Sequence, residues 1–285
     1  MVRAPTISAE LFDTVFRPVM PSLVGVRTLV VVADAPYQSV AFAGLWDRQR
    51  DRYVVEDRAI VAAPSATAYV WALARGRHVV GQGVREAIVI ESPNGDVAES
   101  NGSYLRNDSD DGGVAALYAR AEVRRGEAAT AGRLNGETRD ADVIHVAAPI
   151  YHNAEFPSLS RLLLADAPGQ KHSGAVFAWD VADTELSQAR LVTLEGRFEG
   201  RANSSSQGTL AFSRALLAAG VPNVVGLVAE VKAHSLRQPW LDFHRHYVAG
   251  MPAAESLRQA QLAALSDSNH RPGPWALLTV FGSTQ

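Results

Sequence analysis

The amino-acid sequence predicts an α/β fold built on a mostly parallel, six-stranded sheet with helices on both faces. The first observation is composition, because the 285 residues are 47% hydrophobic and 20% charged, as in an ordinary folded domain. The second is that short apolar segments rich in β-branched residues alternate with helical patterns, which is typical of parallel strands covered on both sides. The six expected strands span residues 27–33, 86–92, 142–148, 189–195, 223–231 and 275–282.

The first third of the chain is expected to start with a helix over residues 8–16, since Ser8 can cap it and prolines follow it. Residues 27–33, RTLVVVA, are continuously apolar, as in a central strand covered on both faces. Residues 53–63 have the mixed pattern of an outer hairpin or edge region. A second helix is expected to begin at Ser65 and to end near Gly76.

The rest of the chain continues the alternation. Residues 94–113 are polar and rich in Gly, Asn and Asp, which predicts a long exposed loop. The segment VAALYARAEV, residues 114–123, predicts a helix, and a shorter helical piece is expected over residues 128–134. Three further helices, which separate the last strands, are expected over residues 208–220, 239–250 and 252–265.

Charge and composition exclude several classes of function. The net charge of -3 and the absence of a basic stripe argue against a nucleic-acid partner. No segment has the ~20 apolar residues of a membrane span, and the start of the chain lacks the apolar core of a signal peptide, so we expect a cytoplasmic protein with no membrane partner. The chain has no cysteine, which excludes disulfides, thiolate metal sites and a cysteine nucleophile. Nothing in the sequence calls for a cofactor.

Six blocks of sequence occur in a fixed order. They are RTLVVVADAPYQSVAFAGLWD, APSATAYVWAL, ADVIHVAAP, PSLSRLLLA, ARLVTLEGRFEG and a C-terminal run from AFSRALLAAGVPNVVGLVAEV to PWALLTVFG. In order and spacing they resemble the CHAT domain family, bacterial relatives of caspases and separases, from about residue 10 to residue 282. The resemblance implies a single caspase-like domain over residues 1–285, and it leaves open whether this is the whole protein or the C-terminal part of a longer one. It also implies a cysteine peptidase with a His and Cys dyad.

The residues of that dyad are absent from the inherited positions. Matching IHVAAPI to the family's Leu-His-x-Ala-Thr-His-Gly puts Pro149 in place of the catalytic His and Ile150 in place of the Gly. Matching VTLEGRFEG to Val-Leu-Ser-Ala-Cys-Glu-Thr-Gly puts Arg197 in place of the nucleophilic Cys. Proline cannot act as a general base, and arginine stays protonated and cannot attack. The resemblance therefore implies a pseudopeptidase, not an enzyme, that acts as a protein-binding or scaffold domain.

Other polar residues near these strand ends have two interpretations each. His145 matches a noncatalytic His of the family and is expected to be a hydrogen-bonded core residue. His152 could serve as the base for a relocated serine nucleophile, either Ser173 or one of Ser204 to Ser206, which would make the chain a hydrolase. Residues 203–208 also precede a helix but lack the Gly-Lys-Ser/Thr of a phosphate-binding loop, so a flexible loop is favoured.

The expected partner is a protein or peptide. Glu195 and Arg197 leave the same face of a strand, so they can pair with each other, or Arg197 can present its guanidinium to a ligand carboxylate or phosphate. In the second case an acidic partner is favoured, in a cleft formed by Tyr151, His152, Glu195 and Arg197. The alternative surface is the helix that carries Trp240 and Tyr247. His244 and His246 are two residues apart on that helix, which argues against a shared metal ion.

Overall fold

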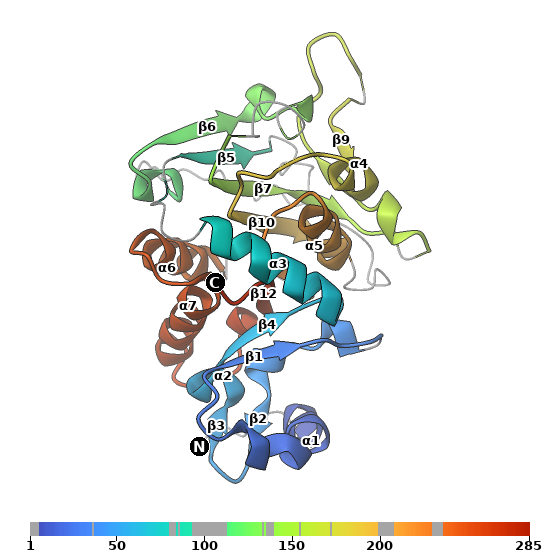
Figure 1. Cartoon of the computed structure of the whole chain (residues 1–285). Coiled ribbons are helices and arrows are strands. Elements are labelled where there is room, and N and C mark those ends of the chain that lie inside the picture. The colour runs from blue at the N-terminus through green and yellow to red at the C-terminus, as the bar shows by residue number, and fades with distance from the viewer. Residues whose placement is uncertain are drawn as a thin grey trace, which may run out of the picture.

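The computed structural model confirms the α/β fold with a mostly parallel sheet. It describes residues 6–35, 37–79, 84, 86–92, 113–132, 134, 140–153, 155–171, 173–198, 208–229 and 236–285, and of residues 79, 197, 198 and 208 it describes the backbone alone. In this part of the chain a single sheet of ten strands runs through the molecule, with helices packed against it (Figure 1). All six strands expected from the sequence are present in the sheet.

The sheet consists of two parallel blocks that run in opposite directions. The larger block contains β11 (Asn223–Leu227), β10 (Leu191–Phe198), β7 (Val143–Tyr151), β5 (Ala87–Glu91) and β6 (Ala121–Arg125), in that order. The smaller block contains β12 (Leu278–Gly282), β4 (Ala59–Ala62) and β1 (Thr28–Val31). Because β12 is antiparallel to β11 but parallel to β4, the carboxyl ends of the two blocks lie at opposite edges of the sheet.

Short elements extend the sheet. The strands β8 (Arg161–Leu163) and β9 (Ala175–Phe177) continue it in antiparallel fashion beyond the end of β7. A separate hairpin is formed by β2 (Trp46–Asp47) and β3 (Arg52–Tyr53). Short 3-10 helices occur at Arg17–Leu23, Tyr37–Ser39, Phe42–Gly44, Ala115–Leu117, Gly126–Ala128, Pro157–Leu159 and Pro274–Leu277.

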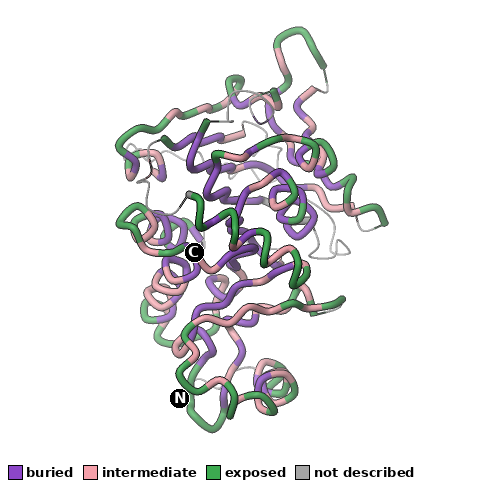
Figure 2. Tube along the Cα trace, in the orientation of Figure 1, coloured by how far each residue is buried: buried purple, intermediate pink, exposed green. Residues whose placement is uncertain are grey.

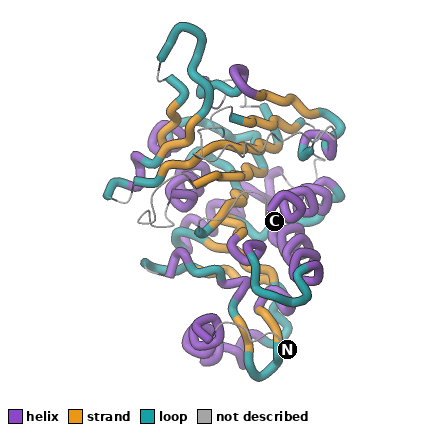
Figure 3. The backbone as a smooth tube through the Cα atoms, turned by 180° about the vertical axis from the view of Figure 1, so that it is seen from behind, coloured by secondary structure: helices purple, strands orange, loops and turns teal. Residues whose placement is uncertain are grey.

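Helices cover both faces of the sheet, as predicted. The α-helices are α1 (Thr6–Val15), α2 (Val54–Asp57), α3 (Ala66–Val79), α4 (Ala178–Ala182), α5 (Gly208–Ala218), α6 (Arg237–Val248) and α7 (Ala253–Asp267). On one face, α4 and α5 pack on the even-numbered side chains of β7 and β10. On the other, α6 and α7 pack on the odd-numbered ones, and Figure 3 shows this helix pair from behind. The central strands are buried throughout (Figure 2), because period-two alternation supplies an apolar side chain to each face.

Three expectations about elements were wrong. Strand β4, within the region expected at an edge, lies between β1 and β12, and β1, expected at the centre, is the edge strand with all four residues partly exposed. A continuous apolar run has the same sequence pattern at the centre and at an edge of a sheet. The sequence therefore does not distinguish the central position of β4 from the edge position of β1. Residues 121–123, the end of the helix expected over residues 114–123, belong instead to β6, because pairing with β5 overrides local helix propensity.

Two expectations lie wholly or mainly outside the described residues. They are the exposed loop over residues 94–113, of which only residue 113 is described, and the loop over residues 203–208, of which only the backbone of residue 208 is described. Of the helical piece expected over residues 128–134, the described part contains the end of a 3-10 turn. None of the described helices is long and apolar enough to cross a membrane.

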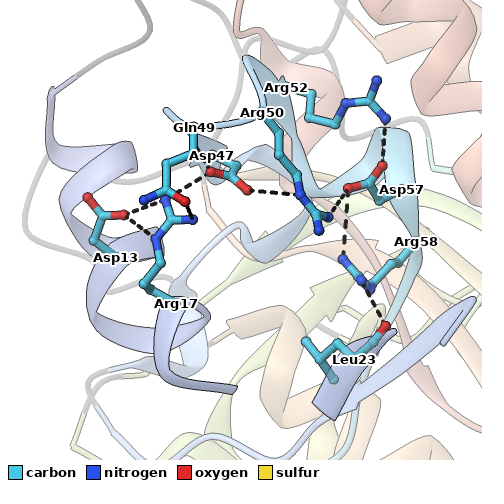
Figure 4. A network of polar contacts seen from close by, with 9 residues as sticks. All are labelled: Asp13, Arg17, Leu23, Asp47, Gln49, Arg50, Arg52, Asp57 and Arg58. Carbon is cyan, nitrogen blue, oxygen red and sulfur yellow. Dashed lines mark hydrogen bonds and ion pairs between the residues drawn. The ribbon is translucent and has the colours of Figure 1, made fainter. Parts of the chain in front are cut away.

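An ion-pair network ties the amino-terminal elements together (Figure 4). The guanidinium of Arg17 contacts Asp13 at 2.8 Å and Asp47 at 2.9 Å, which joins the end of α1 to the β2–β3 hairpin. Arg52 contacts Asp57 at 2.7 Å, and Arg50 reaches the same carboxylate at 3.4 Å. We call these groups, with Arg58 and Gln49, the N-terminal ion-pair network.

Candidate functional site

The carboxyl ends of β7 and β10 bring together the two positions that the resemblance assigns to a catalytic dyad. These strands are parallel neighbours, and their register pairs Pro149 with Arg197 and Ile150 with Phe198. The two positions are therefore side by side at one edge of the sheet, as the sequence predicts. Pro149 is buried and offers no side-chain proton acceptor. The side chain of Arg197 lies outside the described part of the structure.

The space beside this edge is filled. The Ile150 side chain packs over Gly196, so that a Cβ placed on the glycine would lie 2.6 Å from Ile150 Cδ1. Ile150 is 1% exposed and belongs to the core under α4 and α5. Where the family has a glycine that leaves the strand ends open, this chain has a branched side chain in contact with the neighbouring strand.

His145 is a hydrogen-bonded core residue, as expected. Its Nδ1 lies 2.7 Å from the Thr193 hydroxyl, and its Nε2 lies 3.3 Å from the Glu195 carboxylate. The first contact follows from the strand register, which places Thr193 directly opposite His145. His145 is thus a described partner of Glu195. The pairing of Glu195 with Arg197, one of the two alternatives that the sequence offers, lies outside the described residues.

A second imidazole, from α6, lies against the first. The rings of His145 and His244 are 5.2 Å apart, and His244 Nδ1 lies 2.6 Å from the Tyr118 hydroxyl. Burial lowers the pKa of His244 well below its usual value, and the nearby His145 lowers it further. Burial raises the pKa of Tyr118, so the phenol keeps its proton and can donate it to His244. We call Tyr118, His145, Thr193, Glu195 and His244 the buried imidazole cluster.

Two nitrogens beside this cluster lack a hydrogen-bond partner. His244 Nε2 and Trp240 Nε1 are both buried with no partner in the described structure. Both side chains come from one face of α6, and Trp240 is 1% exposed. Trp240 is therefore a core residue and cannot contact a partner, which weakens the alternative surface on this helix. His246 is partly exposed while His244 is buried, so the two point to different surroundings, as expected.

Tyr151 is the last residue of β7 and His152 follows it, and both are partly exposed. His152 Nδ1 is 3.4 Å from the Ser160 hydroxyl, which is long for a hydrogen bond. Ser160 is fully buried, and its oxygen also accepts the backbone N–H of Asn153. The Tyr151 ring lies under the Arg161 guanidinium, 5.3 Å from its centroid.

The serines considered as relocated nucleophiles are placed otherwise. Ser173 donates its hydroxyl proton to the Gln170 carbonyl at 2.7 Å and accepts from the Ala167 N–H at 2.7 Å, which fits a structural role in a turn. Ser204 to Ser206 lie outside the described residues. The described serine that contacts His152 is Ser160, which immediately precedes β8. The sequence alone does not identify it, because only the tertiary pairing of β8 with β7 brings it to His152.

Other places in the described structure offer little chemistry. A hollow of about 20 Å³ lies among apolar side chains of the smaller strand block and α5, including Val31, Leu210 and Phe281. This volume suits about one water molecule. Among the described residues, no group of three His, Asp or Glu side chains could hold a metal ion.

Comparison with known proteins gives the family and the fold. The CHAT domain family model matches residues 6–283. No curated protein sequence matches the chain. The solved structures similar to it include the Arg-specific cysteine proteinase gingipain R, at 10% identity and TM-score 0.54, over 80% of this chain and 55% of that one. The Porphyromonas gingivalis RgpB pro- and mature domains match at 12% identity and TM-score 0.57, over 98% and 67%.

A further match is the Saccharomyces cerevisiae separase in its complex with securin, at 12% identity and TM-score 0.54. It covers 90% of this chain but 15% of the separase chain. Identities this low bear on the fold alone, which is that of caspase-like cysteine proteinases. This chain has no cysteine to match their nucleophile.

Proposed function

This chain belongs to the CHAT domain family, and we propose that it is a member without peptidase activity that binds a protein or peptide at its altered strand ends. The observation that carries the proposal is the register of β7 and β10, which puts Pro149 and Arg197 side by side where the family has its dyad. A proline and an arginine can neither activate nor supply a nucleophile. The chain also holds no cysteine that could replace the missing one.

Binding does not need the lost chemistry. A peptidase groove holds an extended chain through backbone hydrogen bonds and side-chain pockets, and both can persist after catalysis is lost. Next to His152, the segment that leads into β8 exposes two large apolar side chains, Phe156 at 54% and Leu159 at 41%. Such exposed apolar side chains beside a strand end suit contacts with a partner.

The charge at the edge favours an acidic partner. Arg197 stands at the end of β10, and the carboxylate two residues before it, Glu195, contacts His145. Arg161 lies over Tyr151 on the neighbouring side of β7. Guanidinium groups bind carboxylates through paired hydrogen bonds, so we expect a peptide with Asp or Glu next to an apolar residue.

A peptide display library tests this proposal. The protein should enrich acidic sequences, and Arg197→Glu should lose them by about tenfold or more, as expected for a charged pair turned repulsive. The matched control is Arg77→Glu on the exposed side of α3, which should bind like the parent protein. Thermal melting of both variants checks the fold. Equal enrichment by the parent and Arg197→Glu would place binding elsewhere.

One observation favours a second function, a hydrolase with a relocated serine. His152 approaches the Ser160 hydroxyl, although Ser160 has no exposed surface from which a substrate could reach it. A fluorophosphonate probe labels activated serines, and we expect no labelling, with or without calcium or a reducing agent. Labelling that disappears in Ser160→Ala, Ser173→Ala or Ser204→Ala would establish the hydrolase instead.

A further inference from the structure

Strand β6 is one end of the sheet, and its outer side is open in the part of the chain that the structure describes (Figure 1). Its sequence is Ala-Glu-Val-Arg-Arg, and exposed and partly exposed residues alternate along it. Val123, at its centre, is 37% exposed. Figure 2 shows this edge coloured as exposed and partly exposed, next to the mostly buried strand β5.

The backbone groups of β6 divide between the two sides. The Arg120 carbonyl accepts the N–H of Ala87 on β5, and β5 and β6 are parallel. In a strand the N–H and C=O of one residue point to one side, and those of the next point to the other. Glu122 and Arg124 therefore bond to β5, whereas Ala121, Val123 and Arg125 direct their backbone groups outward.

The charges of β6 are complementary to those of a second β6 that runs in the opposite direction. If two copies pair around Val123, Glu122 of each strand stands opposite Arg124 of the other. These are the positions without backbone hydrogen bonds, where opposed side chains approach most closely. The outward groups of Val123 then bond to those of the other Val123, and Ala121 bonds to Arg125. Within one strand, Glu122 and Arg124 already form an ion pair.

The other pairing mode is disfavoured. In a parallel pair only one of two directly opposed residues directs its backbone groups toward the partner strand, as Ala87 does opposite Ala121. Two copies of β6 that both direct the groups of Val123 outward therefore cannot pair in parallel with Val123 opposite Val123, whereas the antiparallel pair bonds them directly. Natural edge strands use charge to prevent association, but in the antiparallel pair the charges of this edge are complementary. Arg125 is held by Glu91 on β5 at 2.5 Å, so the third charge of the strand is already neutralised.

From these observations we propose that β6 is a self-association surface, through which two copies of the chain pair as antiparallel strands about a two-fold axis. Such an interface is isologous, because the same five residues contribute from both copies. A single strand pair buries little area, so we expect a weak dimer with a dissociation constant on the order of 100 µM. This proposal does not use Arg197 or the strand ends of the proposed function.

Sedimentation velocity over a concentration series tests the proposal on the full chain. The parent protein should show a reversible monomer–dimer equilibrium. Glu122→Arg and Arg124→Glu should each raise the dissociation constant by about tenfold or more, because each sets like charges against each other at two symmetric positions. The matched control Glu127→Arg, an exposed residue in the turn after β6, should not change it.

Charge exchange gives the decisive measurement. The double variant Glu122→Arg/Arg124→Glu should dimerise again, and the two single variants should associate when mixed, since each then faces opposite charges. Thermal melting shows whether the variants stay folded. A parent protein that remains monomeric throughout the series, a dimer that Glu122→Arg leaves intact, or a double variant that fails to recover would each overturn the proposal.

Discussion

The two polar groupings of this molecule differ in where they lie and in what holds them. The N-terminal ion-pair network consists of charged side chains near the surface, and Arg50 and Arg52 are half exposed (Figure 4). The buried imidazole cluster lies against α6 and includes His244, which is 0% exposed. The network contains fewer buried residues than the cluster but more side chains of the Asp and Arg type.

From this difference we expect that burial, and not formal charge, determines how much free energy of unfolding is lost when a polar contact is removed. An exposed ion pair contributes about 0.2–1 kcal/mol, because water and salt solvate its partners when it breaks. A buried donor or acceptor that loses its partner costs about 1–3 kcal/mol, because nothing replaces that partner.

Removing one hydroxyl from the buried cluster should have the largest effect. Tyr118→Phe leaves His244 Nδ1 buried without its partner at 2.6 Å, and the free energy of unfolding should fall by about 2 kcal/mol. Urea denaturation gives this value, and Tyr37→Phe, at an exposed tyrosine, should leave it unchanged. The double variant Tyr118→Phe/His244→Phe should lose less free energy of unfolding than the single variant, since neither member of this pair then leaves a buried polar atom without its partner. A double variant less stable than the single one would contradict this account.

A contact in the buried part of the N-terminal ion-pair network should contribute almost as much to the free energy of unfolding as a contact in the buried imidazole cluster. Asp47 is 3% exposed, and its carboxylate accepts from Arg17 at 2.9 Å. Arg17→Met removes this donor but leaves the Gln49 N–H at 3.0 Å, so we expect a loss of about 1.5 kcal/mol in urea denaturation. A loss no greater than that of an exposed pair would show that burial of Asp47 does not matter.

Acid should destabilise the protein through His244. Its pKa is lowered in the folded state by burial, so below the ordinary histidine pKa of about 6.5 the unfolded chain binds a proton that the folded chain does not. Stability from this group is fully present above that pH and decreases as the pH falls toward the folded-state pKa, by up to about 1.4 kcal/mol per pH unit. Urea denaturation at a series of pH values measures the slope.

Two histidine variants show whether His244 causes this dependence of stability on pH. His244→Gln should make the pH dependence shallower, whereas His246→Gln, at a partly exposed position on the same helix, should retain it. Tyr118, His145 and Phe243 contact the buried ring. Identical slopes for the two variants would remove His244 as the source.

The sequence predicted the sheet better than the order of its strands. Apolar β-branched runs indicate strands wherever they lie, and all six were found. Whether a run is central or at an edge depends on neighbours far along the chain, so β1 and β4 were exchanged. The sequence predicts a helix at the start of β6 because Ala, Leu and Tyr are frequent in the segment before it. The strand forms through pairing with β5, which the local sequence does not indicate.

The site was predictable only where it depends on strand ends. Pro149 and Arg197 are paired because they lie near the carboxyl ends of two apolar strands that are parallel neighbours, as the order of the motifs implies. The contact between Tyr118 and His244 joins residues 126 positions apart, and no local sequence pattern predicts it. The contact of Thr193 with His145 depends on a register that a shift of one residue would have reversed.

The exposed end of the N-terminal network should give the smallest effect. Arg52 contacts Asp57 at 2.7 Å, but its side chain is 46% exposed, and Asp57 keeps Arg50 at 3.4 Å. Arg52→Met should therefore lower the free energy of unfolding by about 0.5 kcal/mol in dilute buffer. In about 1 M salt the screening length shrinks to about 3 Å, and the loss should disappear, whereas the loss in Tyr118→Phe should persist because its contact is buried and neutral. The measurement is urea denaturation of both variants at low and high salt. If Arg52→Met costs as much as Tyr118→Phe, or if both losses vanish together in salt, charge and not burial governs the two groupings.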